Sequence, residues 1–442
     1  MKKSVLVIAA LVAPSVGFAQ EARPISLPEA VDLARRNAPG MIQARGTLRT
    51  SAMALRQARW AFSPFNNFVL SYGSSIGGGG SYTSDGVFQQ RNPTSWGFSQ
   101  GFGGAELTLW DGGAKMATVR QRGAQVDQAE VGEITQRFSV AQNVKQQYYL
   151  ILQAREAEAA AIKQIEQATQ QLAAGAARVA AGTAVASDTF SLAIQVGNAR
   201  IALLQAQNNA NNANAQLTRL TGSEFPVTAI VSDTADPPTL RLSDAELISL
   251  ADQGPSVRTS AASLAVTRAQ EKGSRAILWP TITASAGYGR SNSEPTRGGF
   301  TGYDFGAGPM NYNWNFGISA RYTLWNGFAR ESQLLSASVS TDNAEAQLRE
   351  AKLLARQNIT QQIGNLRTAE AQLIIARANV TSAEEALRIQ TIRYQVGAGT
   401  LIDVINAQQQ LTTARNNLIT QRFTLRNSRA QIESTIGREL PQ

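Results

Sequence analysis

A short phrase that occurs twice decides the fold of this chain: LWDG at residues 109–112 recurs as LWNG at residues 324–327, 215 positions later. The same offset relates Gly222 to Gly437, each of which closes a long tract with a helical pattern. One offset that holds through strands, turns and helices indicates a duplicated structural unit. Both halves are therefore expected to contain the same elements in the same order.

The duplication predicts the domain organisation. We expect a first repeat at residues 20–225, a linker at 226–240 and a second repeat at 241–442. Each repeat is predicted to hold an opening helix, a pair of strands and two long helices. The strand pairs fall at about residues 64–110 and 280–325, directly before the duplicated phrase.

Proline and glycine mark the ends of the predicted helices. Pro39 and Pro255 should break the opening helix of each repeat, because proline lacks the amide hydrogen that a helix interior needs. Gly182 and Gly397 stand between the two long helices of each repeat, where a positive φ reverses the chain. We predict that these two glycines form the helix-reversal turns.

The strand before the second copy of the phrase has the clearest alternation. Residues 311–324 read NYNWNFGISARYTL, so that aromatic and aliphatic side chains alternate with polar or small ones. Such alternation over about ten residues is typical of a membrane-barrel strand, although a strand of a soluble sandwich alternates in the same way. Aromatic residues near the strand ends are expected to form girdles at the membrane surfaces. These are Trp279, Trp314, Tyr322 and Trp325.

The first repeat carries a less regular strand. Phe102 and Leu107 differ in parity, and Gly103-Gly104 between them is predicted to form a β-bulge that resets the face. Two strands per repeat give four per chain, which cannot close a barrel without leaving unpaired edges in lipid. We therefore expect three copies to contribute twelve strands to one shared barrel.

The remaining tracts predict unusually long helices. From Gly112 to about Arg178 nothing breaks the helical pattern, which gives a length on the order of 100 Å. Large apolar residues alternate with alanine along one seam, as in helices that pack knobs into holes. The seam residues are Ile151, Ala154, Glu158, Ala161, Ile165, Ala168 and Leu172, and Leu366, Ala369, Leu373, Ala376, Val380, Ala383 and Leu387. The predicted fold class is mainly α with membrane β-strands.

The first nineteen residues resemble a secretory signal peptide. Lys2 and Lys3 precede an apolar stretch at residues 4–16, and small residues lead to an expected cleavage after Ala19. The mature chain would then begin at Gln20, without the cysteine that a lipoprotein anchor needs. Export from the cytoplasm is expected.

Composition narrows the possible functions. The chain has no Cys and no His, so thiol nucleophiles, zinc fingers and Ser-His-Asp triads cannot be built from it. The net charge of +9 is not concentrated in a basic run of the kind that binds nucleic acid. We predict no catalytic residues, no metal ligands, no cofactor and no nucleic-acid partner.

Taken together and in this order, the features resemble the TolC-like outer-membrane efflux protein family. Residues 397–407 read GAGTLIDVINA, which is similar to the Gly-x5-Asp-Val-Leu-x-Ala phrase of that family, and residues 182–188 are a weaker first copy. The resemblance implies a homotrimer in the outer membrane whose helices form an α-barrel tunnel through the periplasm. It also implies a periplasmic adaptor and an inner-membrane transporter, driven by protons or by ATP.

The resemblance assigns roles at the periplasmic tip of the tunnel. Asp403 matches an acidic residue that rings the pore constriction, and Asn406 stands where other members carry a second acid. Tyr394 matches a latch tyrosine whose partners correspond to Ser187 and Asp188. In other readings Asp403 is a helix N-cap and Tyr394 continues the apolar seam.

A departure at the latch concerns residue 399. Some family members carry a latch arginine there, whereas this chain has Gly399. One closing ion pair is therefore expected to be missing, and a tip locked in the family's way is in question.

Three function classes follow in order of preference. The first is an outer-membrane channel-tunnel that passively conducts cargo, as in multidrug efflux or type I protein secretion. The second is a periplasmic coiled-coil structural or adaptor protein without a pore. The third, an outer-membrane hydrolase, is disfavoured because the chain has no His with which to build a catalytic triad.

Overall fold

The computed structural model describes residues 22–76, 80–90, 94–183, 185–230, 242–295 and 310–440. The predicted signal peptide and most of the predicted linker lie outside these residues. The chain divides into two compact units. We call residues 46–131 and 258–350 the strand unit. Residues up to 45, 132–257 and 351 onward form the hairpin unit.

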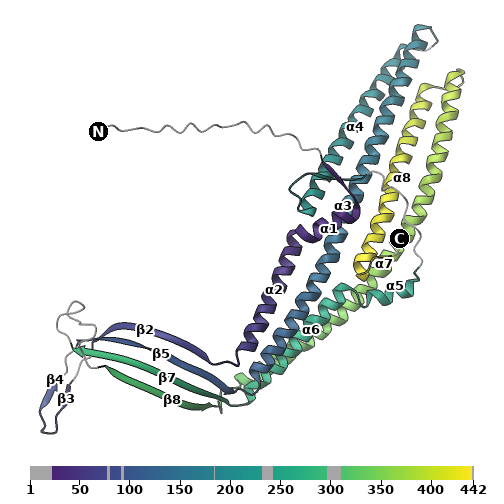
Figure 1. The fold of residues 1–442 in the computed structure, drawn as a ribbon. Helices are drawn as coiled ribbons and strands as arrows, with labels where there is room; N and C mark the ends of the chain where they lie inside the picture. Colours follow the sequence, from purple (N-terminus) through teal and green to yellow (C-terminus); the bar gives the residue numbers. More distant parts are fainter. Residues whose placement is uncertain are drawn as a thin grey trace, which may run out of the picture. The chain divides into compact units, whose positions relative to one another are not determined.

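A four-stranded antiparallel sheet dominates the strand unit (Figure 1). Its strands are β2 (Phe65–Ile76), β5 (Thr94–Trp110), β7 (Thr281–Pro295) and β8 (Asn311–Arg321), and they are ordered β2-β5-β7-β8. Each repeat therefore supplies one adjacent pair, and the pairing of β5 with β7 joins the repeats. A small hairpin of β3 (Gly80–Tyr82) and β4 (Phe88–Gln90) lies between β2 and β5 in sequence.

The bulge predicted at Gly103-Gly104 is confirmed. Asn67 pairs with Gly104 and Phe68 pairs with Phe102, so that one residue of β5 is left out of the register. Gly104 has φ of 132°, a conformation that side chains with a Cβ rarely adopt. Because the bulge adds one residue to β5, apolar side chains before and after it lie on the same face of the sheet although their residue numbers differ in parity.

The helices repeat in length as well as in order. Helices α3 (Ala114–Ala180) and α7 (Ala329–Gln395) have 67 residues each, and α4 (Ala186–Thr221) and α8 (Leu401–Ile436) have 36 each. Among the described helices, none has an apolar stretch long enough to cross a membrane. Equal lengths at matched positions confirm the duplication that the offset of 215 residues indicated.

Both predicted helix breaks are present. Helix α1 (Leu27–Asn37) ends before α2 (Pro39–Trp60), and α5 (Asp244–Ala251) ends before α6 (Pro255–Ser274). A short 3-10 helix, η1 (Arg275–Leu278), follows α6 and leads into β7.

Part of the predicted linker has regular structure, which corrects the sequence expectation. Residues Val227–Ala229 form β6, which pairs in parallel with β1 (Arg23–Ile25). Ile25 and Val227 are fully buried in the apolar core of the first repeat. A three-residue strand gives almost no alternation to detect, and its partner lies about 200 positions away, so the sequence pattern could not show it.

The predicted heptad seam is the buried side of the long helices. Ile151, Ala161 and Ala168 are buried on α3, and Leu366, Ala369, Leu373 and Ala376 are buried on α7. The remaining seam residues are half-buried. Alanine at every second layer permits the close packing of helices that the pattern indicated.

Candidate functional site at the ends of the helical hairpins

Two short turns close the helical hairpins of the hairpin unit. Gly182 has φ of 72° in the turn between α3 and α4, and Gly397 has φ of 78° in the turn between α7 and α8. The residue after each glycine donates a backbone hydrogen bond to the preceding helix: Thr183 to Arg178, and Ala398 to Arg393. Both turns therefore have the geometry of a glycine-terminated helix, and a Cβ at either glycine would strain it.

Asp403 belongs to a capping box at the start of α8. The N-cap residue is Thr400, whose hydroxyl lies 2.8 Å from Asp403 Oδ2 and accepts a hydrogen bond from the Asp403 amide at 3.3 Å. Asp403 stands three residues into the box, which corrects the alternative reading of Asp403 as the N-cap itself. Hydrogen bonds from Thr400 hold the pKa of the Asp403 carboxyl below its usual value, with a smaller contribution from Arg393.

Asn406 lies one helical turn beyond Asp403 on α8. Because residues three apart share a helix face, Asp403 and Asn406 lie on the same side of α8. Asp403 is exposed in the single chain. The first two turns of α8 thus carry one carboxylate, on Asp403, and one amide, on Asn406. This arrangement could line an opening, and it leaves the charge of Asp403 in place at ordinary pH.

Tyr394 connects the two hairpins. It lies in the last turn of α7, and its hydroxyl donates a hydrogen bond to Asp188 Oδ2 at 3.3 Å, in the first turn of α4. Burial raises the pKa of the Tyr394 hydroxyl, and the nearby Asp188 carboxylate raises it further. The tyrosine therefore stays protonated and able to donate throughout the physiological range.

Arg178 is a member of this cluster that the sequence analysis missed. Its guanidinium carbon lies 4.3 Å from the centroid of the Tyr394 ring, and its Nη2 donates to the Tyr394 carbonyl at 3.3 Å. Arg178 stands in the last turn of α3, so the first hairpin holds Tyr394 from both of its helices. We call Arg178, Asp188 and Tyr394 the latch cluster. A basic residue in the last turn of a helix is common, so only the fold reveals its ring contact.

Ser187 and Gly399 lie outside this cluster. Ser187 is exposed, and its hydroxyl makes no hydrogen bond within the described chain. Gly399 has no side chain with which to reach Asp188. Of the residues that the resemblance assigned to the latch, the structure brings together Tyr394 and Asp188.

The predicted girdle residues lie near the two ends of β8. Thr281 pairs with Arg321, so Trp279, Tyr322 and Trp325 lie beyond one end of the β7–β8 pair. Trp314 lies seven residues before Arg321 on β8, which corresponds to about 23 Å at 3.3 Å per residue. Its ring lies 4.5 Å from the ring of Tyr288 on β7, measured between the centroids. All four girdle residues are exposed in the single chain.

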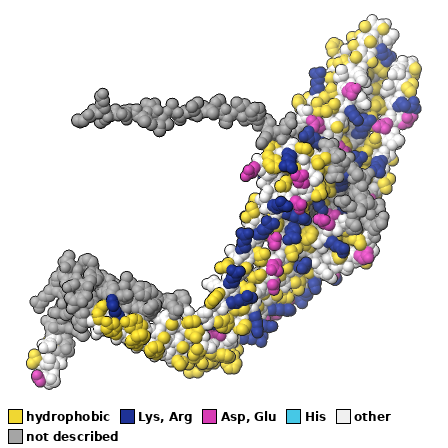
Figure 2. All heavy atoms as spheres, viewed as in Figure 1, with side chains coloured by type: hydrophobic (Ala, Val, Ile, Leu, Met, Phe, Trp, Pro, Cys, Tyr) yellow, Lys and Arg dark blue, Asp and Glu magenta, His cyan; other side chains and the backbone are white. Residues whose placement is uncertain are grey.

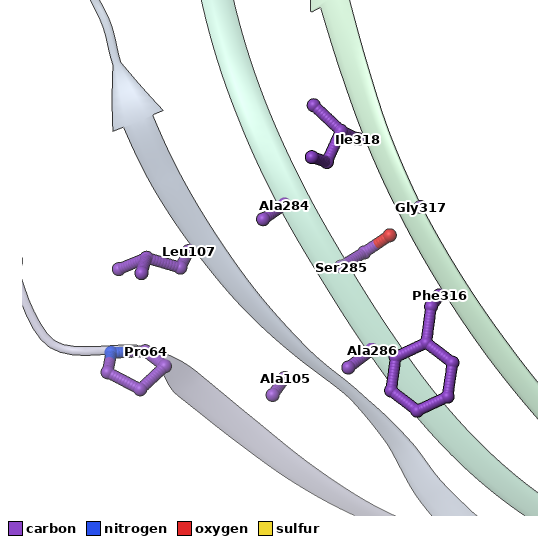
Figure 3. A pocket seen from close by; sticks show the side chains of 9 residues that line it. All are labelled: Pro64, Ala105, Leu107, Ala284, Ser285, Ala286, Phe316, Gly317 and Ile318. Carbon is purple, nitrogen blue, oxygen red and sulfur yellow. The ribbon is translucent and has the colours of Figure 1, made fainter.

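The apolar side chains of β8 are largely exposed in the single chain. Phe316 and Ile318 are each 77% exposed, more than a soluble sandwich would leave them. A depression of about 590 Å³ lies on this sheet, and Figure 3 shows its lining side chains, none of which is charged. It is lined by Pro64, Ala105, Leu107, Ala284, Ser285, Ala286, Phe316, Gly317 and Ile318. An apolar hollow of this kind suits hydrocarbon chains and offers no catalytic group.

Comparisons with known proteins agree with this architecture. A family model described as outer membrane efflux protein matches residues 30–223 and 247–438. The chain is 26% identical to Protein CyaE of Bordetella pertussis over 425 residues, which cover 93% of this chain and 84% of CyaE. It is 24% identical to outer membrane protein TolC of Escherichia coli over 285 residues, 62% of this chain and 55% of TolC. The crystal structure of the outer membrane protein VceC from Vibrio cholerae superposes with a TM-score of 0.73 at 18% identity, covering 94% of this chain and 97% of VceC.

Duplicated long helices with a strand pair inserted into each half define the class of outer-membrane tunnel proteins. The family model matches both halves and most of the chain, and the chain belongs to the outer membrane efflux protein family. The protein is therefore a component of the outer membrane that extends into the periplasm. Within the described residues, no group of acidic side chains is arranged to hold a metal ion.

Proposed function

We propose that this protein is the passive exit duct of a tripartite export system. Three copies would form one tunnel, which receives cargo from a periplasmic adaptor and an inner-membrane transporter. The latch cluster carries this proposal, because it joins the end of the α7–α8 hairpin to the end of the α3–α4 hairpin. A contact of this kind suits a tip that closes and opens.

Asp403 and Asn406 are the proposed constriction. In a closed ring, each copy would add one carboxylate and one amide to the narrowest part of the duct. A ring of carboxylates favours cations, since field lines are focused in a narrow low-dielectric opening. With an amide in the second position, the ring carries half the charge of a two-acid constriction.

The strand unit is proposed to supply the membrane pore. Four strands from each of three copies would close a twelve-stranded barrel, with the polar face of β8 toward water and the apolar face toward lipid. Trp279, Trp314, Tyr322 and Trp325 would then form the two aromatic girdles. The exposed apolar side chains of β8 support this arrangement over a periplasmic coiled coil without a pore.

The cargo follows from the transporter that the duct serves. Small-molecule efflux and type I protein secretion use ducts of this kind with different transporters. Crosslinking of the tagged protein in its native cells, followed by purification in detergent and mass spectrometry, tests the proposal. A proton-driven or ATP-driven transporter should be recovered together with its adaptor. Recovery of outer-membrane and cell-wall components alone, at every crosslinker length, would contradict a role in tripartite export.

A further inference from the structure

Basic side chains gather where the helices of the strand unit meet the sheet, and the proposed duct gives them no role. Helix α2 ends with Arg56 and Arg59 before Trp60, and Lys272 and Arg275 precede Trp279 at the end of α6 and in η1. We call these four basic residues the junction cations. In the strand unit of Figure 2, Lys and Arg side chains gather on the helices and hydrophobic side chains cover the visible part of the sheet.

The junction cations occupy equivalent positions in the two repeats. Arg56 corresponds to Lys272 and Arg59 to Arg275, both at an offset of 216 residues. Each repeat thus carries two basic residues, three positions apart, shortly before its first long strand. Placement at matched positions of both repeats indicates that the cations serve a surface which meets the two helix–sheet junctions in the same way.

Carboxylates balance the charge at these junctions only in part. Helix α2 contains no Asp or Glu. Arg56 reaches only the sulfur of Met53, at 4.0 Å, and Arg59 has no polar partner in the described chain. At the junction of the second repeat, Glu271 pairs with Arg275 at 3.1 Å, and the Arg275 side chain is still 67% exposed.

Large exposed aromatic rings lie beside the cations on the sheet side. Trp60 is 73% exposed and Trp279 is 59% exposed. Arg56 and Trp60 are four residues apart, so they share one face of α2 at an axial separation of about 6 Å. Tryptophan prefers the boundary between hydrocarbon and headgroups, and cations one turn away reach the phosphate layer.

The packing holds these rings at the edge of the apolar sheet. Gly112, with φ of 66°, packs so closely on Trp279 that a Cβ there would lie 2.6 Å from the Trp279 Cβ. The Lys115 ammonium lies 5.9 Å from the centroid of the exposed Phe62 ring and joins the end of β5 to the start of β2. Gly112 thus packs on Trp279 and Lys115 contacts Phe62, both directly after the end of β5.

We propose that the junction cations bind the headgroups of anionic phospholipids at the membrane surface; this rests on the proposed function. The partner is a phosphodiester lipid with net negative charge, such as phosphatidylglycerol, held by Arg56 and Arg59 at one junction and by Lys272 and Arg275 at the other. The site is continuous with the lipid-facing sheet, and its net positive charge complements the phosphate. The duct would therefore select a ring of anionic lipid from the surrounding bilayer.

Intrinsic tryptophan fluorescence can measure this selectivity. All six tryptophans of the chain lie in the strand unit, so lipids with brominated acyl chains quench only the membrane part. The full-length protein would be reconstituted into two sets of vesicles. One set mixes brominated phosphatidylglycerol with unbrominated phosphatidylcholine, and the other mixes unbrominated phosphatidylglycerol with brominated phosphatidylcholine. We expect phosphatidylglycerol to be preferred about fivefold at low salt, the effect of one basic side chain at an anionic surface. The ratio of binding to phosphatidylglycerol over phosphatidylcholine should approach one in molar salt, because salt screens the attraction between the cations and the headgroups.

Variants identify the residues responsible. The double variant R56Q/K272Q removes one of the two cations at each junction and should lower the preference for phosphatidylglycerol, while the channel still conducts in planar bilayers. The control R49Q/R258Q removes two exposed arginines at least ten residues from the tryptophans and should keep the wild-type preference. Arg321→Gln removes a cation on the polar face of β8 and should change ion selectivity without changing lipid preference.

Three results would overturn the proposal. Equal quenching by the two lipids in the wild-type protein would show that no anionic lipid is selected, whatever the variants do. An equal loss in R49Q/R258Q would show a general effect of net charge. Unchanged quenching in R56Q/K272Q together with altered ion selectivity would place the junction cations in the water-filled interior. Conductance of the same samples separates each of these results from a failure of the duct itself.

Discussion

Replacement of Arg178 by alanine should open the tip of the proposed tunnel. Arg178 makes two contacts with Tyr394, a ring contact at 4.3 Å and a hydrogen bond to the carbonyl at 3.3 Å. The ring contact contributes about 1 kcal/mol at a half-buried site. The charge-assisted hydrogen bond adds about 1 kcal/mol after exchange with water. Each chain would therefore lose about 2 kcal/mol of the free energy that favours the closed tip.

The proposed assembly multiplies this loss by three. A total of about 6 kcal/mol is enough to move a two-state equilibrium from mostly closed to mostly open. Single-channel recording in planar bilayers measures the shift as a higher open probability and a larger mean conductance. The open probability of Arg178→Lys should lie between those of the wild-type protein and Arg178→Ala, since lysine keeps the charge but not the planar group that stacks on the ring.

Two further variants make the measurement specific. Tyr394→Phe keeps the ring under Arg178 and removes only the hydrogen bond to Asp188, so it should open the tip less than Arg178→Ala. Lys163→Ala removes an exposed charge from the same helix, 15 residues before Arg178, and should leave the open probability unchanged. A wild-type open probability in Arg178→Ala, with normal insertion, would refute the assignment of Arg178 to the latch cluster.

Three other predictions concern the constriction, the latch at high pH and the helix ends. Asp403→Ala should weaken cation preference and block by multivalent cations in bilayer recordings. In the wild-type protein the pKa of the Asp403 carboxyl lies below its ordinary 3.8, so the cation preference should persist at pH 5 and fade only as the pH drops below 3.8. The raised pKa of Tyr394 means that its hydroxyl stays protonated as pH rises through its ordinary 10, so a pH-dependent opening of the wild-type tip centred below pH 10 would contradict the hydrogen bond to Asp188. Gly437→Ala should lower the free energy of unfolding by about 1–3 kcal/mol, since φ is 67° and a Cβ would lie 2.8 Å from Pro255 Cγ, whereas Gly123→Ala, in an open helical position, should be neutral or stabilising by thermal melting in detergent.

The sequence predicted the elements whose signal is periodic or local. Pro39 and Pro255 broke the opening helices where expected, the seam of α7 is buried from Leu366 to Ala376, and Gly103-Gly104 forms the bulge. Each of these signals lies within a few turns of chain and follows from sterics or helix periodicity. The duplicated offset then indicated the order of elements in both halves.

What the sequence did not reveal depends on contacts between distant residues. The pairing of β1 with β6 joins residues about 200 positions apart through strands too short to show alternation. Arg178 and Tyr394 lie 216 positions apart, and neither residue carries a local mark of its partner. Thr400 was not predicted as the N-cap because the acid of its capping box, three residues later, is itself a residue type that caps helices.

The most direct test of the proposed duct is the ion current of the purified wild-type protein. The protein should resist extraction from native membranes by carbonate, require detergent, and then give steady, cation-preferring current steps in planar bilayers. Release by carbonate without detergent, together with no current from the purified protein, would contradict a channel and favour a periplasmic coiled coil without a pore.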